Sequence, residues 1–322
     1  MNQLLPIRAD GYEASPLHGP ERTWTETNCY VDLWIELLHA LDLDPVAGLA
    51  FTLSVDFEGD QWQFFKYPLE DLRQLYGLAV AEMNPWRGIE FHACEQLAAG
   101  RLLTIEVDAW HLPDTAGVSY GIEHTKTSIV PNLVDPEAQV LGYFHGAGYY
   151  ELSGDDYVGI FVDPAADPAR LAPYVELVRL EGLQRRPDAE LTEIARSLTR
   201  AHLQRRPLTN PIRRFAERLE EDLDWLRAGD LERFHAYAFA TLRQLGASAE
   251  LSASYCEWLH RRGELDAEPA VELAAIAEGA KAFQFQLARA ARGRSIEPTV
   301  ALEELARRWD RAFEAIDERH AG

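Results

Sequence analysis

Helical spacing fills almost the whole chain after residue 165, and this feature restricts the possible folds most strongly. The stretch is rich in Ala, Leu, Glu and Arg, and its apolar residues recur every three to four positions. Asn210 followed by Pro211 is a typical helix start. Typical helix ends are marked by Gly229, Gly246, Gly263 and Gly293. We expect an all-α helical domain over residues 165–322, with helices at 167–183, 188–206, 210–229, 230–246, 250–263, 270–293 and 299–320.

The first 164 residues mix helix and strand signals. A widely apolar helix is expected at 29–41, and shorter helices at 68–76 and 88–99. Period-two or short apolar runs predict strands at 49–55, 62–67, 101–110, 124–134, 139–152 and 157–164. The residues 135–138 read as a turn that joins two of these strands into a hairpin. An early helix followed by antiparallel strands predicts an α+β domain over residues 1–164.

The formal charge of the chain is −22, which makes some partners unexpected. An acidic surface repels phosphate backbones and anionic lipids, so neither a nucleic acid nor a membrane is expected as a partner. The three cysteines, Cys29, Cys94 and Cys256, are an odd number spread far apart and do not form a disulfide framework. The sequence shows neither a signal peptide nor an apolar run of about 20 residues. We therefore expect a soluble, cytoplasmic protein, with no bound metal and with no signal for its oligomeric state.

The stretch "WTETNCYVDLWI" places Cys29 at the start of the first long helix. Either Thr27 or Asn28 can cap that helix, which puts Cys29 in its first turn. The unpaired amides and the positive end of the helix dipole there favour a thiolate. On the helical wheel Cys29 lies between the apolar arc and a polar strip of Asp32 and Glu36. This position fits a nucleophile at the edge of a cleft, and it also fits an ordinary core cysteine.

A nucleophilic cysteine needs a base and a third group that orients the base. The best candidate base is His124, on the polar side of the expected strand at 124–134. Either His145 or Asp135 would orient it. A turn centred on residues 136–137 places Tyr149 opposite His124, so Tyr149 is expected to contact the substrate.

The segments "TNCYVDLWIELLHALDLDPVAGLAF", "LLTIEVDAWHLP" and "EHTKTSIVPNLVDPEAQVLGYFHGAGYYELSGDDY", with the helical tail, resemble a bacterial family of unknown function. The cysteine helix, the strand ending in Asp108 and the His-bearing hairpin are also similar to the N-terminal domain of the butirosin-biosynthesis acyltransferase, a papain-like, bacteriocin-peptidase-like cysteine enzyme. This resemblance implies a papain-like fold for the first domain, with Cys29 as nucleophile and His124 as base. It further implies that an acyl group is carried on sulfur and delivered to a small-molecule amine or to water.

Enzymes of that kind take aminoacyl groups from the phosphopantetheine thioester of an acyl carrier protein, and no other cofactor is expected. Papain-like enzymes usually place a Gln before the cysteine to help hold the oxyanion, but here Thr23 and Thr25 occupy that stretch. The oxyanion donors are therefore expected at Cys29 and Asn28. Asp108 is expected to contact the substrate.

Arginines are concentrated between residues 196 and 218, against the overall acidity of the chain. Arg205 and Arg206 are candidates to dock an acidic carrier protein or a phosphopantetheine phosphate. The alternative is that these arginines are solvated helix faces with acidic neighbours.

Two further functions come from other classes. The missing Gln and the unsettled third residue fit a non-catalytic binding or scaffold protein on a decayed cysteine-enzyme fold. The repeated Glu-x-x-His pairs, Glu232/His235 and Glu257/His260, are typical of metal-carboxylate bundles, if the helices fold back about Gly246. The helical wheels count against the metal site, because His235 and His260 point to opposite kinds of face.

Overall fold

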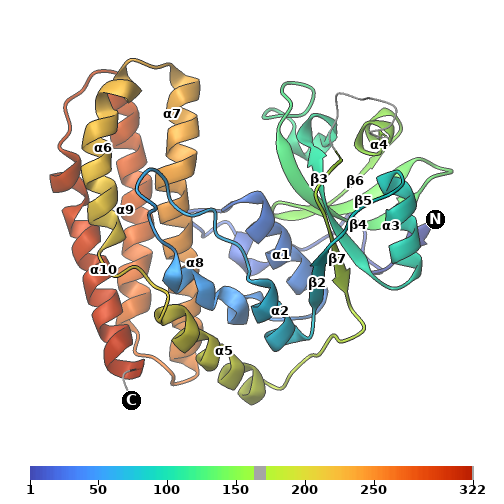
Figure 1. Cartoon of the computed structure of the whole chain (residues 1–322), viewed down its shortest axis with the longest axis horizontal. Coiled ribbons are helices and arrows are strands. Elements are labelled where there is room, and N and C mark those ends of the chain that lie inside the picture. Colours follow the sequence, from blue (N-terminus) through green and yellow to red (C-terminus); the bar gives the residue numbers. More distant parts are fainter. Residues whose placement is uncertain (163–171, 321–322) are drawn as a thin grey trace. The chain divides into compact units, whose positions relative to one another are not determined.

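The computed structural model describes residues 1–162 and 172–320 (Figure 1). It divides into two compact units. The N-terminal unit comprises residues 1–20, 28–45 and 68–186, and the C-terminal unit comprises residues 21–27, 46–67 and 187–322. The domain boundary that the sequence predicts, between residues 164 and 165, lies outside the described residues.

An antiparallel sheet forms the centre of the N-terminal unit (Figure 1). Its described strands follow the order β2–β7–β3–β4–β5–β6, and β1 pairs with β4. Their bounds are β1 Asn2–Gln3, β2 Ala79–Glu82, β3 Leu102–Asp108, β4 Lys126–Asp135, β5 Val140–His145, β6 Gly148–Ser153 and β7 Val175–Arg179. The strand pair β3–β4 aligns Asp108 with Lys126 and Glu106 with Ser128. This sheet, followed by a helical region, confirms the predicted α+β class.

Helices cover both faces of this sheet. Helix α1 (Cys29–Ala40) contacts β4, β5 and β6, while α3 (Ile89–Ala98) contacts β3 and β4 from the other side (Figure 1). Helix α1 is buried almost all round, as its wide apolar arc predicts. Helix α2 (Leu69–Tyr76) and α3 confirm the two shorter predicted helices. A fourth helix, α4 (Asp155–Ile160), follows β6.

Several strand predictions in the first part of the chain are wrong. Residues 49–54 lie in the 3₁₀ helix η2 (Pro45–Ser54). Of residues 62–67, only Trp62 takes part in a β-bridge, with Phe57. Short apolar runs fit a buried helix as well as a buried strand, and periodicity alone does not separate the two. The run at 157–164 fails for the same reason, because its described part belongs mainly to α4. The long strand expected at 139–152 is two strands, since a turn at Gly146, with φ of 49°, separates β5 from β6.

The helix expected at 167–183 is also a wrong prediction in its described part. Residues Val175–Arg179 are strand β7, which pairs with both β2 and β3. Its residues Val175, Leu177 and Val178 are buried, and Glu176 is buried as well. A central strand covered on both faces loses the alternation that identifies strands, which explains why this segment reads like a helix.

The C-terminal unit is mainly helical, as predicted (Figure 1). Its helices are α5 Asp188–Leu203, α6 Pro211–Arg227, α7 Leu231–Ala238, the π-helix η5 Phe239–Arg243, α8 Gln244–Arg261, α9 Glu268–Ala291 and α10 Pro298–His320. Asn210 caps α6 through hydrogen bonds from the amides of Ile212 and Arg213. Gly246 is not a helix end, because α7, η5 and α8 run on without a break and Gly246 packs against the Trp24 ring.

Among the described helices, none combines the length and the apolar character that crossing a membrane requires.

Candidate active site

Cys29 is the first residue of α1, as the capping pattern predicts. The side-chain oxygen of Asn28 accepts hydrogen bonds from the amides of Tyr30, at 3.2 Å, and Val31, at 3.0 Å. These two bonds fix the first turn, which carries the Cys29 amide. Asn28 is buried, whereas Cys29 is partly exposed. The helix therefore holds Cys29 firmly while leaving part of the residue accessible.

A buried carboxylate anchors the residue that follows Cys29. The hydroxyl of Tyr30 donates to Oε2 of Glu176 at 2.6 Å, and the hydroxyl of Thr104 donates to the same oxygen at 2.9 Å. Tyr174 donates to Oε1 of Glu176 at 3.0 Å. Burial, together with the hydrogen bond to Glu176 and its charge, raises the pKa of Tyr30, which keeps this hydroxyl a donor. The N-terminal end of α1 is thus tied to the face of β3 on which Thr104 lies.

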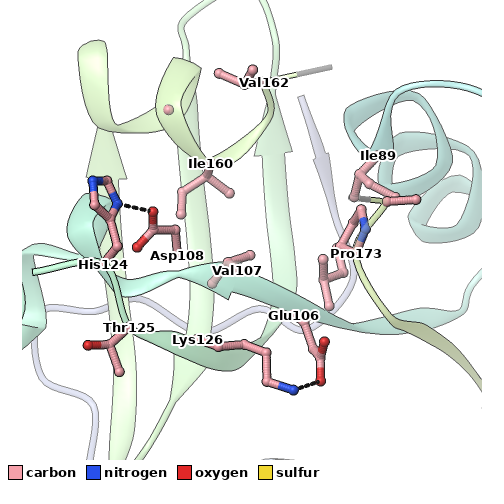
Figure 2. A pocket seen from close by; sticks show the side chains of 13 residues that line it. Ile89, Glu106, Val107, Asp108, His124, Thr125, Lys126, Ile160, Val162 and Pro173 are labelled. Atoms are coloured by element: carbon pink, nitrogen blue, oxygen red, sulfur yellow. Dashed lines mark hydrogen bonds and ion pairs between the residues drawn. The ribbon is translucent and has the colours of Figure 1, made fainter. Parts of the chain in front are cut away.

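The same face of β3 carries a histidine–aspartate pair. Alternate strand residues face the same side, so Asp108 lies on the face of Thr104. Nδ1 of His124 lies 2.6 Å from Oδ2 of Asp108. The Trp110 amide donates to Oδ1 of Asp108 at 3.0 Å, and the Trp110 ring stacks on the His124 ring at 4.6 Å between centroids. Figure 2 shows the imidazole with this nitrogen directed at the carboxylate.

The charge of Asp108 is favoured by these contacts. Burial by itself would raise the pKa of Asp108, but the hydrogen bonds from His124 and from the Trp110 amide outweigh it and lower the pKa. A carboxylate that accepts from Nδ1–H holds the imidazole in the tautomer whose Nε2 can accept a proton. The His124 side chain is 69% exposed, so a substrate can reach this nitrogen. An imidazole oriented in this way can act as a general base.

A pocket of about 560 Å³ adjoins this pair (Figure 2). One part of its wall is apolar, with Val107 from β3 and Ile160 from α4. The other part carries two hydrogen-bonded pairs, Asp108 with His124 and Glu106 with Lys126, the second at 2.9 Å. The described residues that line the pocket do not include Cys29. The pocket therefore offers both an apolar subsite and a polar end with a base.

Several residues expected near His124 lie elsewhere. Asp135 lies at the turn after β4, where its Oδ1 accepts from the amides of Glu137 and Ala138, at 3.2 and 3.1 Å. Tyr149 belongs to β6 and pairs with Phe144, because the chain turns again at Gly146. The buried Tyr149 hydroxyl accepts a hydrogen bond from Asn132. Neither Asp135 nor Tyr149 accompanies His124, and the predicted register between them was wrong.

His145 forms a second histidine–aspartate pair of its own. Its Nδ1 lies 2.5 Å from Oδ2 of Asp114, and its Nε2 lies 2.8 Å from the hydroxyl of Thr127. Thr127 is aligned with Val107, so this array lies on the face of β3 and β4 opposite to Asp108. His145 does not orient His124. The array stabilises the sheet face under α4, and nothing in the residue pattern of the sequence signals it.

The polar strip on α1 does not open onto a cleft. Asp32 and Glu36 are buried, and His18 contacts both, with Nε2 at 3.3 Å from Asp32 and Nδ1 hydrogen-bonded to Glu36. Tyr12 and the amide of Ser15 also donate to Glu36. The N-terminal segment therefore covers this side of α1, which sequence periodicity does not show.

The arginine-rich stretch is largely paired within its own unit. Arg206 forms two hydrogen bonds with Asp317, and Arg205 contacts His202 and the carbonyl of Ala201. Arg213 pairs with Glu303 and Asp310. Arg206 and Arg213 thus match the alternative of helix faces with acidic neighbours. Arg205 has no carboxylate partner among the described residues.

The structure does not bring the two Glu-x-x-His pairs together. Because the helix continues through Gly246, the pairs Glu232/His235 and Glu257/His260 lie about 35 Å apart along one helical run. Glu257 pairs with Arg261 instead. Within the described residues, no group of three or more His, Cys, Asp and Glu side chains has the arrangement of a metal site.

Comparison with protein families covers almost the whole chain. The model of the DUF1839 N-terminal domain matches residues 13–180, and that of the DUF1839 C-terminal domain matches residues 188–318. A search of curated proteins finds no match. The expected family of unknown function is thereby identified as DUF1839. Neither comparison links the chain to the butirosin-biosynthesis acyltransferase or to a papain-like fold, so that finer assignment stays a prediction.

Proposed function

The chain belongs to the DUF1839 family, and from the geometry of its N-terminal unit we propose that it transfers acyl groups through Cys29 on a papain-like framework. The observation that carries the proposal is the hydrogen bond between Asp108 and His124. It lies on the same face of β3 as the Glu176 site that anchors Tyr30, the neighbour of Cys29. A cysteine at a helix start and an oriented imidazole are the two parts that thiol catalysis requires.

The chemistry divides into two half-reactions. Nε2 of His124 takes the Cys29 proton while the sulfur bonds to the thioester carbonyl carbon, and the carbonyl π electrons move to oxygen. When the carbonyl re-forms, the bond to the leaving thiolate breaks, and that thiolate takes the proton from His124. An amine or water then attacks the acyl carbon, gives its proton to His124, and displaces the Cys29 sulfur, to which His124 returns the proton.

Each neighbouring residue has a part in this scheme. Asp108 keeps His124 in the required tautomer and stabilises the imidazolium, while the Cys29 amide donates to the oxyanion. Asn28 contributes by holding the turn that carries this amide, since its side-chain oxygen caps the helix.

The donor in this proposal is an aminoacyl or acyl thioester, of the kind that an acyl carrier protein presents on phosphopantetheine. The acceptor is a small-molecule amine or water. Arg206 is paired with Asp317, so Arg205 is the better candidate of the two for a contact with an acidic carrier protein.

Intact mass spectrometry tests the proposal. The protein is incubated at pH 7 with aminoacyl thioesters of N-acetylcysteamine, and a covalent acyl adduct on Cys29 is expected. Cys29→Ala should abolish the adduct, and Cys94→Ala is the matched control that should retain it. An adduct that survives in Cys29→Ala, or none in the native protein with any thioester, contradicts acyl transfer through this residue.

A non-catalytic binding protein is the second candidate, and one observation favours it. Cys29 is absent from the described lining of the pocket that His124 and Asp108 share. In that case a ligand binds the pocket with equal affinity in the native protein and in Cys29→Ala, and no acyl adduct forms.

A further inference from the structure

A second pocket lies within the C-terminal unit and encloses about 300 Å³. The segment 24–26, helix α7, the π-helix η5 and helix α9 supply its walls. This volume is at the lower end for small-molecule sites, so it suits a small ligand. A π-helical turn at its edge is notable, because such turns are frequent at functional sites.

Lys281 lines the pocket, and its ammonium group lies over an aromatic ring rather than beside a carboxylate. Nζ of Lys281 lies 4.3 Å from the centroid of the Trp24 ring. That ring is itself fixed, since Nε1 of Trp24 donates to the carbonyl of Ala277 at 3.0 Å. Among the described residues, no carboxylate lies within ion-pairing distance of Nζ. Lys281 is one of three lysines in a chain of charge −22, so an unpaired ammonium here is an available anion contact.

Arg243 faces the same pocket and is held in place from one side. Its Nε donates to the carbonyl of Thr27 at 3.1 Å, and its Nη2 donates to Glu26. The described residues offer no hydrogen-bond acceptor to Nη1 of Arg243. The Glu26 side chain is 64% exposed, so water screens its charge. The guanidinium is therefore oriented, with one nitrogen left for a ligand.

The pocket also contains a polar atom that lacks a partner. The side-chain oxygen of Gln284 is buried and has no hydrogen-bond partner among the described residues. A buried acceptor without a donor is unfavourable, and a ligand hydroxyl would satisfy it. The two cations, Lys281 and Arg243, favour a negatively charged ligand, and the Gln284 oxygen favours a ligand with a hydrogen-bond donor. We propose that this pocket binds a small oxyanion, a phosphate or a carboxylate, that also carries a hydroxyl group.

Calorimetric titration of the full chain at pH 7 and constant ionic strength tests this proposal. Inorganic phosphate and lactate are the probes, because each combines a negative charge with a hydroxyl group. Saturable binding of phosphate identifies a phosphate-type ligand, and preferential binding of lactate identifies a hydroxycarboxylate. Sulfate, which carries no hydroxyl group at this pH, should bind more weakly than phosphate. If neither phosphate nor lactate binds, the proposal is overturned.

Substitutions of Lys281 and Gln284 assign the contacts. Lys281→Met should weaken binding about tenfold or more, while Lys281→Arg should retain most of it. Lys66→Met is the matched control, because Lys66 also lies over an aromatic ring but does not line this pocket. Gln284→Leu should weaken phosphate binding and leave sulfate binding unchanged. An equal loss in Lys66→Met and Lys281→Met contradicts the assignment. These measurements are independent of acyl transfer through Cys29.

Discussion

Nδ1 of His124 and Oδ2 of Asp108 lie 2.6 Å apart, at the junction of β3 with the segment that leads into β4. The Trp110 residue contacts both partners, with its amide on Asp108 and its ring on His124. This arrangement makes Asp108 the orienting residue of the proposed mechanism.

Replacing Asp108 by Asn should therefore reduce acyl transfer. The carboxamide keeps the size of the side chain but no longer favours the tautomer that leaves Nε2 as the proton acceptor. We expect kcat to fall by about 10²-fold, near the lower end for acid–base groups because His124 is exposed to water. The Asp135→Asn variant is the matched control, since Asp135 lies in a turn, and its kcat should stay unchanged. Equal rates for Asp108→Asn and the native protein contradict an orienting role.

The Glu176 carboxylate should contribute both to stability and to the placement of Cys29. Its two oxygens accept from three hydroxyl groups, and glutamine has a single acceptor oxygen. We expect Glu176→Gln to lower the free energy of unfolding by about 1–3 kcal/mol in urea titrations. Alkylation of Cys29 in the folded variant should also slow.

Glu181→Gln is the control for this effect. Glu181 makes a half-exposed ion pair with Arg101, so its loss should lower the free energy of unfolding much less than the loss of Glu176. If Glu181→Gln and Glu176→Gln lower the free energy of unfolding equally, the three hydrogen bonds of Glu176 do not stabilise the fold more than a surface ion pair does.

The cluster of His18, Asp32 and Glu36 should make stability depend on pH. Burial alone lowers the pKa of His18, but the hydrogen bonds and charges of Asp32 and Glu36 outweigh it and raise the pKa to about 9. The folded state thus binds the proton more tightly than the unfolded state, whose histidine pKa is about 6.5. The stabilisation is complete below about pH 6.5 and is lost as the pH rises through about 9.

Urea unfolding at several pH values measures this dependence. Between about pH 6 and pH 9 the free energy of unfolding should fall by on the order of 2–3 kcal/mol more in the native protein than in His18→Gln. Parallel curves for the two proteins contradict a protonated His18 in the fold.

Gly246 should tolerate no side chain, although it lies inside a helix. Alanine in a helix is normally favoured over glycine by about 1 kcal/mol. Here a Cβ would lie 2.3 Å from an atom of the Trp24 ring, and overpacking of this kind costs about 1–3 kcal/mol. We expect Gly246→Ala to lower the melting temperature. In a Trp24→Leu background the same substitution should be neutral or stabilising, and a loss there as well would exclude the contact as the cause.

Local signals in the sequence identify the elements that carry the site, but not the partners within it. The cap at Asn28 and the position of Cys29 follow from residue types a few positions apart, as does the strand that ends in Asp108. The contact between Asp108 and His124 depends on the β3–β4 register, which aligns Asp108 with Lys126, two residues beyond His124. The sequence alone does not show that β3 pairs with β4 in this register, so it does not predict the contact between Asp108 and His124.

Two other features depend on contacts between residues distant in the sequence. Glu176 lies in a segment that reads as a helix, because β7 is buried on both faces and shows no clear alternation. The burial of Asp32 and Glu36 depends on His18 and Tyr12, which a loop brings over α1. Helix periodicity identifies a polar strip but does not show what covers it.

The rate of Cys29 alkylation by iodoacetamide at pH 7, compared between the native protein and His124→Gln, tests the central claim most directly. Burial raises the pKa of Cys94 and raises the pKa of Cys256 to about 12, so both serve as slow internal references. If His124 activates Cys29, native Cys29 reacts at least about tenfold faster than Cys94, and His124→Gln removes most of that difference while the Cys94 rate is unchanged. A Cys29 rate equal to that of Cys94, and unaltered in His124→Gln, would contradict the pairing of this thiol with this imidazole.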